Sequence, residues 1–295
     1  MKHAYLIMAH YRPDLLHYLI ESIDDERNDI FIHIDKKNQN LTWNLSAKKA
    51  SVFVISSKNI IWGSYSQIEC EYRLLEAANK NMKYDYYHLL TGVTFPLKNQ
   101  DYIHSFFKKN QGAEFIGFDN KKDYSFRAKY HLLFPNRGKR VGKIGSLLDK
   151  SESIYIKIQQ LLGINRLNEE NLIIKKGLAY FSITNDFVEY VLSQEKVIKK
   201  LLKGSICGDE VFIQTLAFNS DFRNKLYNFN DEYKGCLRLV PWDNNLPITK
   251  KRNKEFELEL EDLPNILSSE CLFAFKFDGP DGLQLIDTIK KASKI

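Results

Sequence analysis

Short apolar runs alternate with helix-like stripes along the first hundred residues. Apolar runs at 4–9, 30–34, 52–55 and 86–90 have the length of buried strands. Between them, apolar side chains recur at helical spacing after Pro13 and again over 66–79, where they form one stripe. Strands that alternate with helices predict an α/β fold with a mostly parallel central sheet flanked by helices. Ligands of such folds bind at the carboxyl ends of the strands, so His10, after the first strand, and Asp35, at the end of the second, are candidate ligand contacts.

The second half of the chain continues this alternation of predicted strands and helices. Strands are predicted at 115–118, 177–183 and 237–240, and a helix at 186–192. No internal repeat or low-complexity linker divides the chain, which favours a single domain over 1–295. Within it we expect a nucleotide-binding half (1–118), a basic variable region near the acceptor (119–176), and a catalytic, diphosphate-binding half (177–295).

Two adjacent acids, Asp209 and Glu210, precede an apolar run at 211–216. Its apolar residues recur at i, i+3 and i+4, so the segment is predicted to be a helix that carries the acids in its first turn. Acids in that position commonly cap the helix and oppose its dipole. The alternative is that one of them performs catalysis.

Lys276 is a second unusual residue, because it lies within an aromatic run at 272–278. A buried lysine requires an anionic partner, although a lysine at the edge of a sheet can also serve to discourage aggregation. No two aspartates stand at i and i+2, and neither a Walker loop nor the Rossmann glycine pattern is present. Fixed cations, Lys276 and the basic cluster at 250–254, could therefore take the place of a metal beside a leaving diphosphate.

A basic, aromatic stretch at 121–143 includes Arg127 and Lys129, with Asp123 as its one acid. It is interpreted either as a solvated loop or as a site for an anionic or lipid-linked acceptor near a membrane surface.

The composition is that of a folded protein that favours anionic partners. The chain has 295 residues, 44% hydrophobic side chains and a formal net charge of +6. No apolar run reaches the ~18–20 residues of a membrane span, so a soluble, cytoplasmic protein is expected. Four widely spaced cysteines form no Cys-x-x-Cys pair, which argues against a zinc knuckle, and His10 is assigned to nucleotide contact rather than to metal binding.

Several ordered sequence blocks together resemble glycosyltransferase family 14, which contains the core-2/I-branching enzymes and the peptide xylosyltransferases. The blocks are Ala4-Tyr5-Leu6-Ile7 with His10, Ile32-His33-Ile34-Asp35, Trp62-Gly63-Ser64-Tyr65-Ser66, Tyr87-His88-Leu89-Leu90-Thr91-Gly92, Phe95-Pro96-Leu97-Lys98, Gly177-Leu178-Ala179-Tyr180-Phe181, Asp209-Glu210 and Leu272-Phe273-Ala274-Phe275-Lys276-Phe277-Asp278.

The resemblance implies a GT-A fold and inverting, metal-independent sugar transfer from a UDP donor to an acceptor hydroxyl. It assigns the catalytic base to Glu210, the diphosphate contact to Lys276, the uridine contact to Asp35 and the acceptor site to Trp242. Asp209 remains a helix cap and positioning group with a donor-sugar contact. A second diphosphate-binding cation falls near Asn253, so Arg252 and Lys254 are both candidates for it.

The expected protein is therefore a bacterial-type transferase in surface polysaccharide synthesis. N-acetylglucosamine is the favoured donor sugar, with xylose or another hexose as alternatives, and no cofactor or metal is expected. The acceptor is a glycan, with a lipid-linked glycan at the inner face of the plasma membrane as one form, and Arg127 and Lys129 as contacts. A non-catalytic carbohydrate- or nucleotide-binding protein is the alternative class. A nucleic-acid-binding protein that uses the basic stretch at 121–143 is a further, less favoured class, and nucleic acid is not expected as a partner of the transferase.

Overall fold

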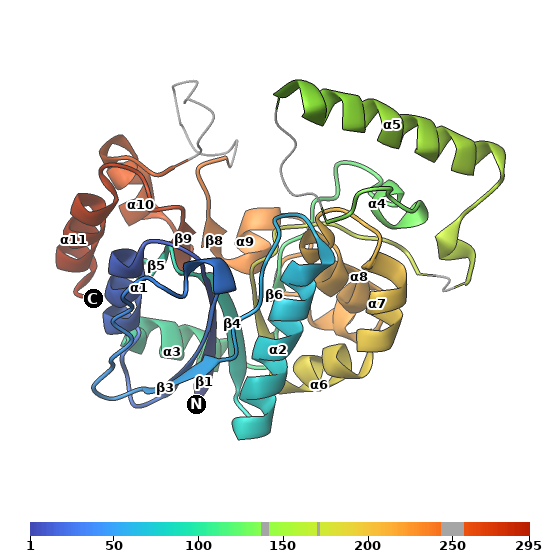
Figure 1. Ribbon diagram of the computed structural model, residues 1–295. Coiled ribbons are helices and arrows are strands. Elements are labelled where there is room, and N and C mark those ends of the chain that lie inside the picture. Colours follow the sequence, from blue (N-terminus) through green and yellow to red (C-terminus); the bar gives the residue numbers. More distant parts are fainter. Residues whose placement is uncertain (137–141, 170–171, 243–256) are drawn as a thin grey trace.

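The computed structural model describes residues 1–136, 142–169, 172–242 and 257–295. Its centre is a six-stranded sheet with strand order β3-β2-β1-β4-β7-β6 (Figure 1). The four strands β3, β2, β1 and β4 are parallel, whereas β7 is antiparallel to β4 and to β6. The strands are β1 (His3–Ala9), β2 (Asn28–Ile34), β3 (Ser51–Ile55), β4 (Tyr86–Thr91), β6 (Phe115–Ile116) and β7 (Phe181–Thr184). The predicted α/β fold with a mostly parallel central sheet is confirmed.

Helices bury both faces of this sheet, as the uninterrupted apolar strands require. Tyr5 and Ile7 of β1 pack into one core with α1 and α3, and Ala4 and Leu6 pack into the other with α2, α6, α7 and α8. The helices are α1 (Pro13–Ser22), α2 (Tyr65–Asn81), α3 (Gln100–Lys109), α6 (Asn185–Ser193), α7 (Glu195–Leu202) and α8 (Phe212–Phe218). The helices predicted after Pro13, over 66–79 and over 186–192 are confirmed.

A second sheet of three strands, order β5-β9-β8, extends the fold beyond the central one. Its core is closed by α1, α10 and α11. These elements are β5 (Thr94–Pro96), β8 (Arg238–Leu239), β9 (Phe273–Phe275), α10 (Leu263–Ser268) and α11 (Gly282–Ser293). The predicted strand around Lys276 therefore ends one residue before this lysine.

The predicted strand at 177–183 is shorter than expected and begins at Phe181. Gly177 instead donates its backbone N–H to the carbonyl of Glu210 at 3.0 Å. A Cβ at Gly177 would lie 1.8 Å from the carbonyl oxygen of Gly117, so only glycine allows the two backbones this close approach. The segment before β7 thus helps to position Glu210.

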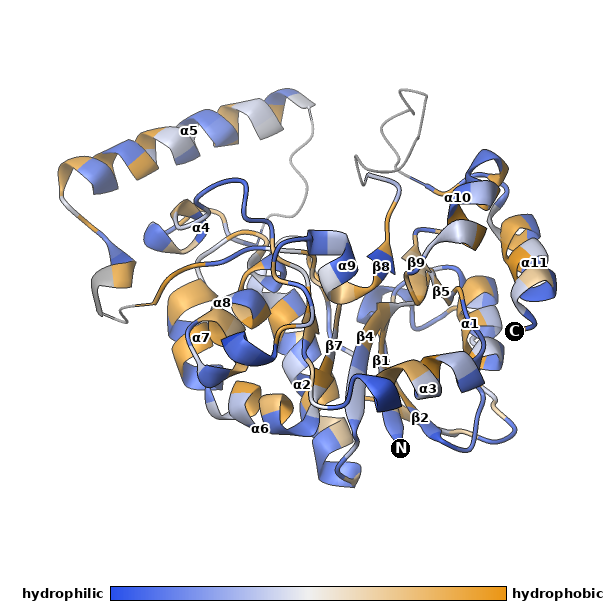
Figure 2. Cartoon of the chain, turned by 180° about the vertical axis from the view of Figure 1, so that it is seen from behind, coloured by the Kyte–Doolittle hydropathy of each residue, from blue (hydrophilic) through white to orange (hydrophobic). Residues whose placement is uncertain are grey.

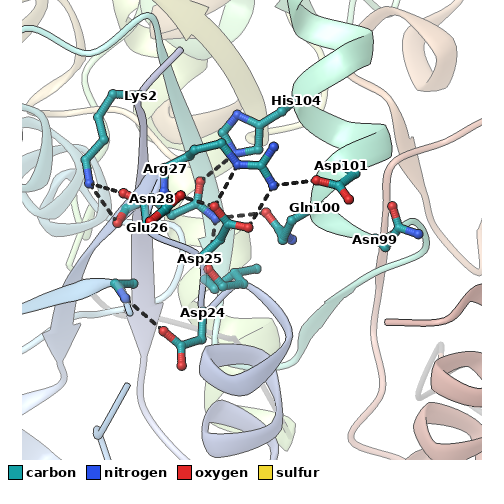
Figure 3. A network of polar contacts seen from close by, with 12 residues as sticks. Lys2, Asp24, Asp25, Glu26, Arg27, Asn28, Asn99, Gln100, Asp101 and His104 are labelled. Carbon is teal, nitrogen blue, oxygen red and sulfur yellow. Dashed lines mark hydrogen bonds and ion pairs between the residues drawn. The ribbon is translucent and has the colours of Figure 1, made fainter. Parts of the chain in front are cut away.

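At the amino ends of β1 and β2 the polar side chains form a dense network (Figure 3). The Asn28 amide nitrogen donates to the carbonyl of Ile23 and to Gln100 Oε1, both at 2.8 Å, and its oxygen is 2.9 Å from His104 Nε2. Arg27 makes a two-point ion pair with Asp25, both contacts at 2.7 Å. These contacts connect β2, α1 and α3 at the edge opposite the ligand site described next.

Candidate functional site

A cleft of about 450 Å³ opens at the carboxyl ends of β1, β2 and β4. The position is that expected for a ligand in an open α/β sheet. Six of the residues selected from the sequence line it: His10, Asp35, Asp209, Glu210, Trp242 and Lys276. They come from widely separated segments, so folding brings the predicted site together in one place.

Asp35 follows β2 directly and is 5% exposed. Its backbone N–H donates to the carbonyl of Ala9 at 2.8 Å, and its Oδ1 accepts from the backbone N–H of Lys37 at 3.0 Å. These bonds hold the carboxylate at the cleft wall. His10 lies at the exposed rim, with its ring 4.2 Å from that of Tyr11.

Glu210 ends a short 3₁₀ turn, η3 (Gly208–Glu210), and its side chain is 34% exposed. Its Oε2 accepts from Arg127 Nη1 at 2.6 Å and lies 3.8 Å from Lys176 Nζ. Arg127 Nη1 also donates to the carbonyl of Cys207 at 3.1 Å, on the same turn. Two cations therefore orient the carboxylate of Glu210 while leaving it open to the cleft.

Asp209 does not cap a helix, so that prediction is wrong. Helix α8 begins only at Phe212, and the residue before it, Val211, makes no side-chain cap. The Asp209 carboxylate turns instead toward α2, where Oδ2 accepts from Gln67 Nε2 at 2.9 Å, while Oδ1 is buried with no hydrogen-bond partner among the described residues. Burial, and then the nearby charge of Glu210, raises the pKa of Asp209 to about 7.

Glu71, on α2, is an acid that lines the cleft and that the sequence reasoning missed. It is 1% exposed, and its Oε2 has no hydrogen-bond partner among the described residues. Burial, followed by the charge of Asp209, raises the pKa of Glu71 well above its usual value and so favours the protonated carboxyl. The signal was available: Glu71 falls three residues after Ile68, on the apolar stripe of the helix.

Lys276 lies directly after β9 at the other side of the cleft. Its Nζ is 2.9 Å from Asp278 Oδ2 and 3.6 Å from Glu257 Oε1. The Tyr11 hydroxyl also donates to Asp278, and Arg12 Nη1 donates to the Asp278 carbonyl at 3.0 Å. The side chain is 26% exposed, so the amine is anchored by acids yet accessible to an anionic ligand.

Aromatic side chains form the remaining wall. The ring of Trp242 packs edge-on against Phe275, with centroids 5.7 Å apart. Trp62 also lines the cleft and is 51% exposed. It belongs to a sequence block recognised above, but its exposure was not visible from the sequence. Exposed aromatic rings suit the apolar faces of sugars and nucleobases.

The remaining predicted residues divide into three groups. Arg127 reaches the site, but as the direct partner of Glu210. Lys129 is not among the cleft residues, and its amine lies 5.5 Å from the ring centre of Tyr130. Arg252 and Lys254 lie outside the described residues.

Among the described residues, no group of three or more histidine, cysteine, aspartate or glutamate side chains has an arrangement that could hold a metal ion. Metal independence stays a prediction.

The fold and the cleft define an α/β protein with a polar and aromatic ligand site at the carboxyl edge of its sheet. The family model described as Core-2/I-Branching enzyme matches residues 3–267. Because this match covers most of the 295 residues, the chain belongs to the Core-2/I-branching enzyme family.

Individual relatives are distant. Xylosyltransferase sqv-6 of Caenorhabditis briggsae is 23% identical over 287 residues, which cover 89% of this chain and 33% of the relative. The human beta-1,3-galactosyl-O-glycosyl-glycoprotein beta-1,6-N-acetylglucosaminyltransferase is 22% identical over 259 residues, covering 81% of this chain and 54% of the relative. The chain thus spans between a third and about half of the length of these relatives. Among solved structures, apo mouse xyloside xylosyltransferase 1 aligns with 92% of this chain and 97% of its own, at 10% identity and a TM-score of 0.38.

Proposed function

We propose that the chain is a glycosyltransferase with a GT-A fold, which moves a sugar from a UDP-sugar to a hydroxyl of a glycan acceptor with inversion and without a metal. The observation that carries the proposal is the single cleft that brings Asp35, Glu210, Trp242 and Lys276 together at the carboxyl edge of the sheet. Membership of the Core-2/I-branching family and two relatives named as sugar transferases support it.

In this mechanism Glu210 acts as the general base. Its carboxylate accepts the proton of the acceptor hydroxyl while that oxygen attacks the anomeric carbon from the side opposite UDP. Arg127 and Lys176 hold the carboxylate in place before reaction, and a base fixed in this way loses little orientational freedom on reaching the transition state. Lys276 stabilises the negative charge that develops on the leaving UDP. Asp35 binds the uridine, and Trp242 supports the acceptor.

The donor sugar is proposed to be N-acetylglucosamine, with xylose or another hexose as alternatives. The melting temperature measured with each of a series of UDP-sugars tests which donor the protein binds, because a ligand that binds the folded state raises its apparent stability. The largest shift identifies the donor. Transfer should also continue in EDTA, and strict dependence on a divalent ion would contradict the metal-free mechanism.

Glu210→Gln is the test of the base. We expect turnover to fall by about 10²–10⁴-fold, because the amide cannot accept the proton. The affinity for UDP, measured by calorimetry, should stay within about twofold, since the change lies outside the proposed nucleotide contacts.

Glu232→Gln is the matched control for this test. Glu232 Oε1 also lies 3.8 Å from Lys176 Nζ, so its loss perturbs the same lysine without removing the base. It should keep most of the turnover. If Glu210→Gln kept as much activity as Glu232→Gln, Glu210 would not be the base. If UDP bound but no UDP-sugar were turned over by the wild type, the chain would be a nucleotide-binding protein instead.

A further inference from the structure

Helix α5 (Gly142–Leu161) runs along the outside of the molecule, above the short α4 (Phe126–Lys129) (Figure 1). One stripe of apolar side chains on it is strongly exposed: Ile144 is 76% exposed, Leu147 68%, Ile154 60% and Leu161 88%. A surface helix of a globular protein normally turns such a stripe toward the core. In this helix the orientation is reversed.

Polar residues make the contacts with the body of the protein. Glu152 is 4% exposed, and its Oε1 accepts from the backbone N–H of Leu133 at 2.8 Å. Gln159 is 2% exposed and is bonded twice to the backbone of His131, at 2.9 and 2.8 Å. These bonds fix the rotation of α5, so its apolar face is held away from the core. Figure 2 shows hydrophobic and hydrophilic residues interleaved along the whole helix.

The charges around the apolar face are arranged unequally. Lys143, Lys150 and Lys157 repeat every seven residues and therefore lie along one edge of this face. The two acids of the helix, Asp149 and Glu152, lie on other sides, Glu152 being the one that binds the body. The face and its edge together are apolar and cationic.

A second copy of the chain does not suit this surface. The apolar face has the spacing of a coiled-coil seam, but the lysines occupy all three g-type positions, and Leu148, Tyr155 and Leu162 occupy the e-type positions. In an antiparallel pair the lysines would face each other. In a parallel pair they would face apolar residues. Neither arrangement offers an acid to pair with the lysines.

A basic hollow of about 560 Å³ lies next to the segment that Gln159 holds. Its lining contains six basic side chains and no acid, namely His131, Arg166, Lys196, Lys199, Lys200 and Lys203, together with Gly204. Arg166 donates one nitrogen, Nη2, to the carbonyl of Lys200 at 2.6 Å, while Nη1 is buried without a hydrogen-bond partner among the described residues. A buried, unsatisfied guanidinium nitrogen in a cationic hollow suits a phosphate-type anion.

We propose that α5 and this hollow form a docking surface for an anionic lipid bilayer. The apolar face of α5 enters the boundary between headgroups and acyl chains, and the lysines and Arg166 meet headgroup phosphates. The helix lies on the bilayer, since none of the described helices combines the length and the apolar content needed to cross it. This inference does not depend on the proposed sugar transfer.

Flotation with lipid vesicles tests the proposal on the full chain. We expect binding to phosphatidylcholine vesicles that contain about one third phosphatidylglycerol, and weak binding to phosphatidylcholine alone. Leu147→Glu combined with Ile154→Glu should weaken the binding at least about tenfold, because two charges would enter the apolar boundary. Val54→Glu is the matched control: Val54 is 54% exposed on β3, away from the surface, and its change should leave binding unaltered.

A charge variant tests the hollow separately. Lys199→Gln with Lys200→Gln should weaken binding to anionic vesicles by about 25-fold, at about fivefold for each lysine, and raised salt should also weaken it.

Both pairs of substitutions are at exposed positions, and unchanged thermal unfolding would show that the fold is intact. Equal binding of all variants, or no binding of the wild type to anionic vesicles, would overturn the proposal. So would a wild-type dimer in sedimentation that Leu147→Glu with Ile154→Glu dissociates.

Discussion

The two ends of the central sheet bury different kinds of polar side chain. At the amino end, Asn28 and Gln100 have hydrogen-bond partners for their amide groups within the protein (Figure 3). At the carboxyl end, Asp209 and Glu71 each keep a buried oxygen without a partner among the described residues. Unpaired buried atoms occur at both ends, because His3 Nε2 and His104 Nδ1 at the amino end also lack a partner among the described residues. Asp209 and Glu71 differ in that they line the cleft, where a ligand could satisfy their oxygens.

The same contrast sets opposite responses to pH. Burial lowers the pKa of His3, His88 and His104 near the amino end, and raises the pKa of Asp209 and Glu71 at the cleft. A folded state that buries neutral histidines loses stability as the pH falls, and one that buries neutral carboxylic acids loses stability as the pH rises. The two ends can therefore be tested independently.

Asn28→Ala should give the largest loss of stability. The change removes three hydrogen bonds of a fully buried side chain and takes this partner from the carbonyl of Ile23 and from His104 Nε2, which should lower the free energy of unfolding by about 2–4 kcal/mol. Denaturant unfolding measures it. Asn40→Ala, at an exposed site, is the control and should have an effect within about 0.5 kcal/mol. Equal effects would mean that the amino-end network does not stabilise the fold.

Acid should destabilise the protein through its buried histidines. The pKa of His104 is lowered from 6.5 to about 4, first by burial. The pKa of His104 is lower in the folded state than in the unfolded state. Its contribution to the free energy of unfolding is therefore fully present above pH 6.5 and is lost as the pH falls toward 4. His104→Gln, which keeps an amide donor and does not titrate, should flatten the fall of melting temperature over this range. His17→Gln, at a half-buried position on α1, is the control.

Glu71→Gln should have a smaller effect of the opposite sign. The pKa of Glu71 is raised in the folded state. Its contribution to the free energy of unfolding is therefore present below the unfolded pKa and is lost as the pH rises. The variant removes this loss and should be more stable than the wild type by about 1 kcal/mol at pH 8, with little difference under acid conditions. Glu76→Gln, on the exposed side of the same helix, is the control. A variant that is less stable than the wild type at pH 8 would show that Glu71 is ionised and paired.

The sequence predicted the sheet because its strands are apolar on both faces, and it predicted the cleft residues that lie next to a strand end, such as Asp35. It did not predict contacts between distant segments. Arg127 meets Glu210 across 83 positions, and Asp209 is held by Gln67 across 142, so no local pattern shows that these partners exist. A local rule also produced the error at Asp209, because capping statistics ignore a competing partner on another helix. The orientation of α5 is a similar case, since its rotation depends on Glu152 and Gln159.

The domain boundaries at 118 and 176 and the contacts of Arg252 and Lys254 stay predictions. So do the roles of the individual cleft residues.

Calorimetric titration with UDP tests the central claim, that the carboxyl edge is the nucleotide site. Lys276→Met keeps the aliphatic stem but removes the amine, and should weaken UDP binding by about tenfold or more. Lys2→Met removes an amine at the amino edge, where Lys2 pairs with Asp29 at 2.8 Å, and should leave UDP binding unchanged. Wild-type affinity in Lys276→Met, or equal losses in both variants, would contradict the assignment of the cleft.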